Sequence, residues 1–272
     1  MIINHNLNAM NSHRQMGMNV NNAAKSMEKL SSGLRINRAG DDAAGLSISE
    51  KMRGQIRGLD QASRNSQDAI SLIQTAEGAL NETHAILQRQ RELIVQAGNG
   101  GTLETEDLNA IKAEITELNA ELDGIAERTQ FNGKKLLDGG FASDFQIGAN
   151  GGQKLTLTIA TKMDSGTLGV SALAPDGTSG QTTTDLGLVD TAIKTVSGIR
   201  SSLGANQNRL EHTIKNLDNA AENLQAAESR IRDVDMAKEM MNFTKNNILN
   251  QASQAMLAQA NQQPQAVLQL LR

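Results

Sequence analysis

The stretch GLSISEKMRGQIRGLDQASRNSQDAISLIQTAEGALNETHAILQRQRELIVQA, residues 45–97, decides the fold of this 272-residue chain. It contains no proline, and steps of four and three residues select a mostly apolar series. The series is Met52, Ile56, Leu59, Ser63, Ser66, Ile70, Ile73, Glu77, Leu80, His84, Leu87, Arg91 and Ile94. Such a heptad seam lets a helix lie along a partner helix over its whole length. At ~1.5 Å per residue the helix would be roughly 80 Å long, so the pattern predicts an elongated helical bundle.

Two further heptad seams predict the partners of this helix. Leucine and isoleucine recur over 105–129, after a glycine-rich turn, and this helix should fold back antiparallel. The heptad returns over 188–232, where the register predicts that Leu217 is buried, as it predicts for Ile70 in the first seam. A last helix is expected over 235–262, with Pro264 as its end.

The middle of the chain has a different character. Leu155, Leu157 and Ile159 alternate with polar residues, which predicts a strand, and Phe145 and Ile147 indicate its hairpin partner. Residues 162–187 read as a loop or weak strands. The fold class is therefore mainly α, an elongated antiparallel bundle with a small β-hairpin region at 141–161.

The two ends of the chain carry thin apolar stripes among many polar residues. A helix with so thin a stripe is marginal alone in water, so it is expected to become ordered against copies of itself. The sequence hypothesis for the polymerisation interface is Leu7, Met10, Val20, Met27, Leu30, Leu34, Ile248, Leu249, Ala252, Met256, Leu268 and Leu271. Between the first two helices, Asp41 or Asp42 is expected to cap the second.

Composition argues against an enzyme. The chain has no Cys, Trp or Tyr, a net charge of −4 and no clustered basic face, which argues against thiolate chemistry, aromatic pockets and nucleic-acid binding. No histidine has a second ligand at helical spacing, so neither a metal site nor a cofactor is expected. No apolar run suits a membrane span, and the start of the chain lacks the apolar region of a cleavable secretory signal.

Two function classes fit these patterns. One is a filament subunit whose terminal helices pair with copies of themselves. The other is a secreted coiled-coil adaptor or translocator-type protein that binds a different partner. An adaptor needs one recognition surface, whereas a polymer needs the stripes at both ends of the chain.

Five motifs indicate a family. LSSGLRINRAGDDAAGL at 30–46 and FNGKKLLDG at 131–139 resemble the N-terminal region of bacterial flagellins. AESRIRDVD at 227–235, AQANQQP at 258–264 and LQLLR at 268–272 resemble their C-terminal region. The resemblance covers nearly all of the chain outside 141–187, which is too short for the extra surface domains of many flagellins.

The resemblance implies a domain plan and a role. Segments 1–44 and 233–272 would pair as the inner-tube helices, and 45–232 would form the outer-tube domain that includes the β-rich segment 141–187. The protein would be an extracellular subunit of the flagellar filament, the propeller of swimming motility, exported by the type III route without a cleaved signal. Implied partners are other copies, an export chaperone at the C-terminal helix, and the hook-associated junction and cap proteins.

The resemblance also implies a contact with a Toll-like receptor of innate immunity. The matching positions are Arg89, Leu93 and Glu114. Two neighbours depart from the commonest pattern: Gln90 stands where many relatives have Val or Met, and Ile94 where many have Ala or Val. Gln90 shares a second stripe with apolar residues, so a polar group is expected in a helix contact.

Overall fold

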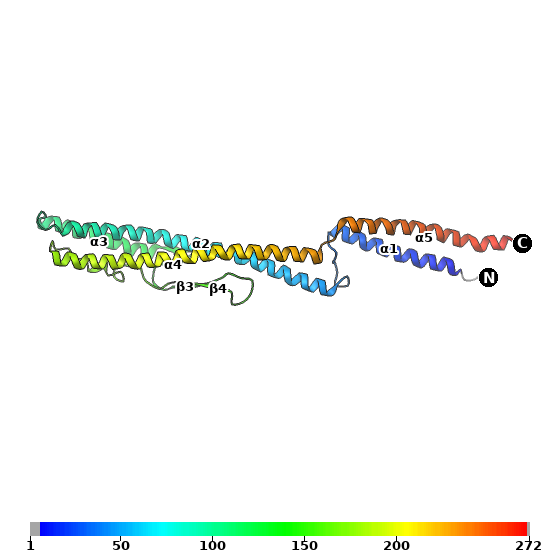
Figure 1. The fold of residues 1–272 in the computed structure, drawn as a ribbon, viewed down its shortest axis with the longest axis horizontal. Coiled ribbons are helices and arrows are strands. Elements are labelled where there is room, and N and C mark those ends of the chain that lie inside the picture. The colour runs from blue at the N-terminus through cyan, green and yellow to red at the C-terminus, as the bar shows by residue number, and fades with distance from the viewer. Residues whose placement is uncertain (1–5, 271–272) are drawn as a thin grey trace. The chain divides into compact units, whose positions relative to one another are not determined.

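The structure is a computed structural model that describes residues 6–270, with side chains described as far as Gln262. The helices are α1 (Leu7–Ser32), α2 (Ala43–Ala97), α3 (Thr105–Arg128), η1 (Val170–Ala172), α4 (Ser179–Arg232) and α5 (Met236–Leu270) (Figure 1). The strands are β1 (Gln130–Phe131), β2 (Lys134–Lys135), β3 (Phe141–Gln146) and β4 (Lys154–Ile159). The fold is mainly α, as the sequence predicts.

The chain divides into two compact units, each described by itself. We call Met1–Gln55 with Glu222–Arg272 the terminal unit, and Ile56–Ala221 the bundle unit. The division at 44/45 and 232/233 that the resemblance implies remains a prediction.

In the bundle unit α2 lies against two antiparallel partners. Ser63 Oγ donates to Asp218 at 3.1 Å, and Arg91 Nε donates to Asp190 at 3.0 Å, so positions rise along α2 as they fall along α4. Gln90 on α2 donates to Asn119 on α3 at 2.9 Å. The three helices therefore form the antiparallel bundle that the seams predict.

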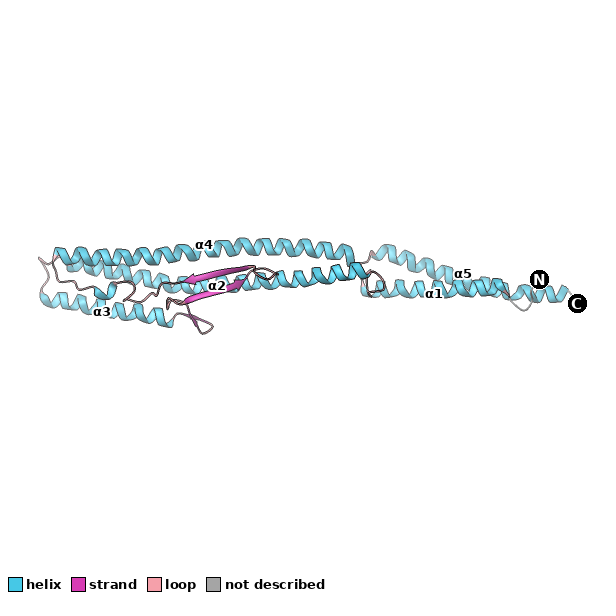
Figure 2. Cartoon of the chain, turned by 90° about the horizontal axis from the view of Figure 1, so that it is seen from below, coloured by secondary structure: helices cyan, strands magenta, loops and turns pink. Residues whose placement is uncertain are grey.

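The hairpin is also confirmed. Strands β3 and β4 pair antiparallel, from Phe141 opposite Ile159 to Gln146 opposite Lys154 (Figure 2). Leu155, Leu157 and Ile159 are buried, while the residues between them are exposed. The hairpin thus covers one side of the bundle unit with its apolar face, and the Asn65 amide on α2 donates to the carbonyl of Gln146 at 3.1 Å.

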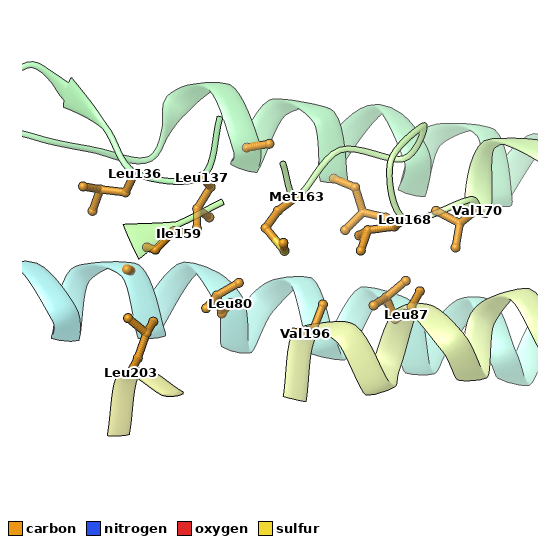
Figure 3. Close-up of a cluster of buried hydrophobic side chains, with 14 of the residues drawn as sticks. Leu80, Leu87, Leu136, Leu137, Ile159, Met163, Leu168, Val170, Val196 and Leu203 are labelled. Carbon is orange, nitrogen blue, oxygen red and sulfur yellow. The ribbon is translucent and has the colours of Figure 1, made fainter. Parts of the chain in front are cut away.

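The core of the bundle unit is where α2, α4 and the segments after α3 meet. Figure 3 shows Leu80 and Leu87 of α2 and Val196 and Leu203 of α4 among side chains from those segments. The latter are Leu136, Leu137, Ile159, Met163, Leu168 and Val170. All of these side chains are buried, so the bundle unit has a conventional aliphatic core without Trp or Tyr.

From Ile70 onward, the predicted seam of α2 departs from the buried residues at every second position. The buried residues there are Ala69, Ala76, Thr83, Gln90 and Ala97, most of them one position before the predicted residue. Ile70 is partly buried and packs against the core, and Leu217 is buried as predicted. Because α3 and α4 cover α2 from two sides, small residues occupy the closest contacts. Glu77 and Arg91 instead form ion pairs with α4, at 3.7 Å to Arg200 and 3.0 Å to Asp190.

The expectation of a loop or weak strands over 162–187 is wrong in its second half. Helix α4 begins at Ser179 rather than near Leu188. Its first turns contain Thr182, Thr183 and Thr184, whose hydroxyls each donate to the carbonyl four residues earlier, at 2.8 to 3.1 Å. Threonine favours strands by propensity, and the tertiary contacts of this segment override that preference.

In the terminal unit α1 and α5 lie side by side (Figure 2). The prediction that Pro264 ends the last helix is wrong, because α5 continues to Leu270. A proline has no N–H, so it leaves the carbonyl of Ala260 without its usual helical donor. The Asn6 amide donates to that carbonyl at 2.7 Å, which removes one cost of keeping proline inside the helix.

Candidate assembly surface

The inward face of α1 mixes small and polar residues with two large apolar ones, Met16 and Leu30. Asn6 caps the helix by accepting the N–H of Ala9 at 3.1 Å, and Gly33 ends it in the left-handed conformation. The covered positions recur at steps of three and four, which is the spacing of a helix seam. They are Ala9, Ser12, Met16, Asn19, Ala23, Ser26 and Leu30.

The matching face of α5 has the same character. Asp235 caps the helix by accepting the N–H of Lys238 at 3.1 Å. The covered positions at seam spacing are Phe243, Asn246, Asn250, Ser253, Leu257 and Ala260. Asn19 donates across the pair to Ser253 at 3.3 Å, and Asn250 Oδ1 is buried without a hydrogen-bond partner. The seam between α1 and α5 therefore combines a polar contact with apolar side chains, among them Phe243 and Leu257.

The segment between α1 and α2 fastens this pair to the end of α4. Leu34 bridges to Asp233, and the N–H of Arg35 donates to the carbonyl of Arg232 at 2.6 Å. Asp42 accepts the N–H of Gly45 at 2.8 Å and so caps α2, as predicted for one of the two aspartates.

Asp41 makes different hydrogen bonds from Asp42. It accepts the N–H groups of Asn37 and Arg38 at 3.1 and 3.0 Å, and these hydrogen bonds lower the pKa of Asp41. The carboxylate therefore closes the turn that precedes α2.

Large apolar side chains of α1 and α5 point away from each other. Leu7 is 67 % exposed, Met10 65 %, Ile248 59 % and Met256 58 %. Val20, Met27 and Leu249 are exposed as well. A stable folded chain ordinarily buries such side chains, each worth roughly 1.5–3 kcal/mol when fully buried. We call these seven residues the outward face.

The predicted interface residues fall into three groups. Seven form the outward face, and Ala252 is exposed beside them. Leu30 and Leu34 are half-buried within the terminal unit. The side chain of Leu268, and Leu271 as a whole, lie outside the described residues. Sequence reasoning did not select Met18, Met236, Met240 and Met241, which are also exposed on these helices. A count of exposed apolar residues on every face of each helix would have found them.

The implied receptor residues lie on α2 and α3. Arg89 contacts Glu114 at 2.8 Å and Glu92 at 3.3 Å, and hydrogen bonds to these carboxylates raise the pKa of Arg89. All three charged groups are exposed, whereas Leu93 is only 2 % exposed and belongs to the core.

Gln90 is buried, as its stripe predicts. Its amide donates to Asn119, and Asn119 donates to the carbonyl of Val170 at 3.4 Å. Gln90 Oε1 is buried without a hydrogen-bond partner. Ile94 is fully buried in the same core. The unusual glutamine is therefore part of a polar link between α2, α3 and η1.

Metal binding and membrane insertion can both be checked on the described residues. No three His, Cys, Asp or Glu side chains in this part of the chain could hold one metal ion. Nor does any helix within 6–270 have the length and apolar character of a membrane span. The fold and the outward face define a helical structural protein built to pack against further chains.

Comparisons with known proteins give the family. The family described as "Bacterial flagellin N-terminal helical region" matches residues 3–142, and "Bacterial flagellin C-terminal helical region" matches residues 186–271. A flagellin of Halalkalibacterium halodurans is 65 % identical, and one of Bacillus subtilis is 59 % identical, each over 100 % of both chains. The crystal structure of Bacillus cereus flagellin is 33 % identical and aligns with a TM-score of 0.50, over 57 % of this chain and 88 % of that one.

The chain belongs to the bacterial flagellin family. It is a structural subunit of the flagellar filament, the organelle of swimming motility, and not an enzyme. The adaptor or translocator alternative is not favoured by these relatives.

Proposed function

We propose that the chain polymerises outside the cell through the outward face of α1 and α5. The observation that carries the proposal is that large apolar side chains such as Leu7, Met10 and Ile248 lie in solvent, while Ser and Asn share the seam between α1 and α5 with apolar residues. Copies packed around this face would remove its apolar side chains from water.

The same face accounts for the other partners that the family implies. Before assembly, an export chaperone at the C-terminal helix would cover the apolar residues of α5, such as Ile248 and Leu249. At the two ends of a filament, where no further copy is available, hook-associated junction and cap proteins would take that place. Export would proceed by the type III route without a cleaved signal.

A Toll-like receptor is a further proposed partner, supported by the family resemblance at Arg89, Leu93 and Glu114. Since Leu93 belongs to the core, its part would be to support the exposed charged pair. Receptor binding should weaken for Arg89→Ala and hold for Arg91→Ala, which removes a similar ion pair on the same helix. Equal binding by both variants would contradict the assignment.

Seeded assembly tests the polymerisation interface. Ile248→Asp and Val20→Asp each place a carboxylate on the outward face, where assembly would have to remove the charge from water. We expect filament yield, measured by sedimentation, to fall below detection while the thermal melt of the monomer changes little. Val95→Asp, on an exposed apolar position of α2, is the matched control and should assemble normally.

The outcomes separate a surface role from a folding role. If both outward-face variants assemble like the wild type, the proposed interface is wrong. If Val95→Asp fails as completely as they do, the effect is not specific to the terminal unit. A lowered melting temperature in all three would indicate that the charge damages the fold.

A further inference from the structure

Methionine is unevenly distributed over the chain. Of the ten methionines within the described residues, seven are exposed, and all seven lie on α1 or α5. They are Met10, Met18, Met27, Met236, Met240, Met241 and Met256. In the bundle unit Met163 is fully buried. The thioethers that solvent can reach are thus concentrated on the helices that carry the outward face.

These thioethers are also the softest oxidisable groups in the protein. The chain contains no Cys, Trp or Tyr, so mild oxidants meet no thiol, indole or phenol. Methionine sulfur is readily converted to the sulfoxide, and the conversion can be reversed by methionine sulfoxide reductases. An oxidant in the surrounding medium would therefore act on α1 and α5 before any other part of the chain.

The exposed sulfurs on α5 lie among the residues that assembly would cover. A shallow groove on this helix is lined by Met240, Met241, Thr244, Lys245, Ile248 and Leu249. Methionine suits such a surface because its flexible, polarisable chain adapts to the packing partner. A sulfoxide is polar and strongly accepts hydrogen bonds, so burying it against apolar side chains is unfavourable.

We propose that the exposed methionines of α1 and α5 are a peroxide-sensitive modification site that controls assembly. Hydrogen peroxide transfers one oxygen atom to the thioether sulfur, its O–O bond breaks, and water leaves, so each methionine and peroxide give one sulfoxide and one water. Free subunits modified in this way cannot enter a filament until the sulfoxides are reduced. Subunits already assembled are protected, because their neighbours cover the sulfurs. This inference rests on the proposed polymerisation interface.

Peroxide treatment of the purified full-length chain tests the proposal. Peptide mass spectrometry should show sulfoxides at the seven exposed positions and none at Met163, which reports that the bundle unit stays folded. Seeded filament yield should fall about tenfold or more. Treatment with the two reductases specific for the two sulfoxide epimers should restore it. Filaments exposed to the same peroxide dose should carry far less sulfoxide than free subunits.

A variant with leucine at all seven positions provides the matched control. Its own untreated filament yield is the reference, and peroxide should not lower that yield, because the variant has no exposed thioether left to oxidise. If this variant cannot assemble untreated, the reductase rescue of the wild type decides the question. Failure of untreated wild-type chain to polymerise would contradict the proposed interface. Normal assembly of fully oxidised wild type would overturn the modification proposal and leave that interface intact.

Discussion

The bundle unit and the terminal unit use the same few residue types in opposite ways. In the bundle unit Leu80, Leu87 and Leu210 are fully buried, and most charged residues lie outside. In the terminal unit Ser26 and Ala260 are buried, while Leu7 and Ile248 lie in solvent. The first arrangement completes a folded unit by itself. The second leaves apolar surface exposed, which indicates that its final partners are other chains.

The largest difference in stability between the units is expected when one apolar side chain is removed from each. Leu87→Ala leaves a cavity in the bundle unit and should lower its free energy of unfolding by roughly 2–5 kcal/mol. Ile248→Ala removes an exposed side chain and should change stability by less than about 0.5 kcal/mol. Urea unfolding of both monomers measures the difference. Equal losses would erase the contrast between the units.

Gln90 and Asn119 form a hydrogen-bonded amide pair inside the bundle unit. Substituting them tests how much a polar contact contributes to the stability of a unit whose core is mainly aliphatic. Asn119→Leu leaves the Gln90 amide buried without its acceptor and should cost about 1–3 kcal/mol. The double variant Gln90→Leu/Asn119→Leu removes both groups and should recover most of that loss. A double-mutant cycle by chemical unfolding tests the coupling, and simple additivity of the two changes would show that the pair is not a linked unit.

Two aspartates of the bundle unit should respond to pH in opposite directions. Burial raises the pKa of Asp185, with only partial compensation from the amide of Gln181, which donates to Oδ1 at 2.8 Å; Oδ2 has no hydrogen-bond partner. Burial would also raise the pKa of Asp164, but hydrogen bonds from Lys162 and Thr167 outweigh it and lower that pKa to about 2.

The direction in which stability changes with pH depends on whether the folded or the unfolded state binds the proton more tightly. Asp185 favours folding below the unfolded pKa of about 3.9, and the advantage is lost as pH rises through its folded pKa. Asp185→Asn should therefore raise the melting temperature at neutral pH, and the gain should vanish near about pH 3. Asp164→Asn should lower it at neutral pH, with the loss fading as pH falls towards about 2. Melts across pH 2–7 compare them, and matching pH profiles would refute the assignment.

The smallest effect is expected at the surface of the bundle unit. Arg91 and Asp190 form an ion pair at 3.0 Å with both side chains about half exposed, at 49 % and 47 %. Solvent and salt screen such pairs, so Asp190→Asn should cost less than about 1 kcal/mol. Thermal melts at low and high salt would detect it. A loss as large as that of Leu87→Ala would show that the ion pair, not the core, holds α2 and α4 together.

Sequence periodicity predicted the bundle unit well because its heptads repeat without interruption. Val189, Val196 and Leu203 recur every seven residues, and all are buried. The series contains Ile70 rather than Ala69 because a hydropathy pattern favours the larger residue. In the structure Ala69 is fully buried, whereas Ile70 is only partly buried against the core.

Prediction was weakest where a distant residue decides the local structure. Nothing near Pro264 indicates that Asn6 donates to the carbonyl of Ala260, far away in the sequence. The spacing of apolar residues reveals the stripes at both ends of the chain. It does not reveal whether a stripe faces the partner helix or the solvent. In the structure, stripe residues such as Leu7 and Ile248 lie in solvent, whereas other positions of α1 and α5 form the seam.

A filament structure determined by electron cryo-microscopy would test the central claim most directly. If the outward face is the assembly surface, Val20 and Ile248 should be buried against neighbouring copies, and the seam between α1 and α5 should keep the hydrogen bond from Asn6 to Ala260. If α1 and α5 instead turned their apolar residues towards each other, or left them in solvent in the filament, the account would be contradicted.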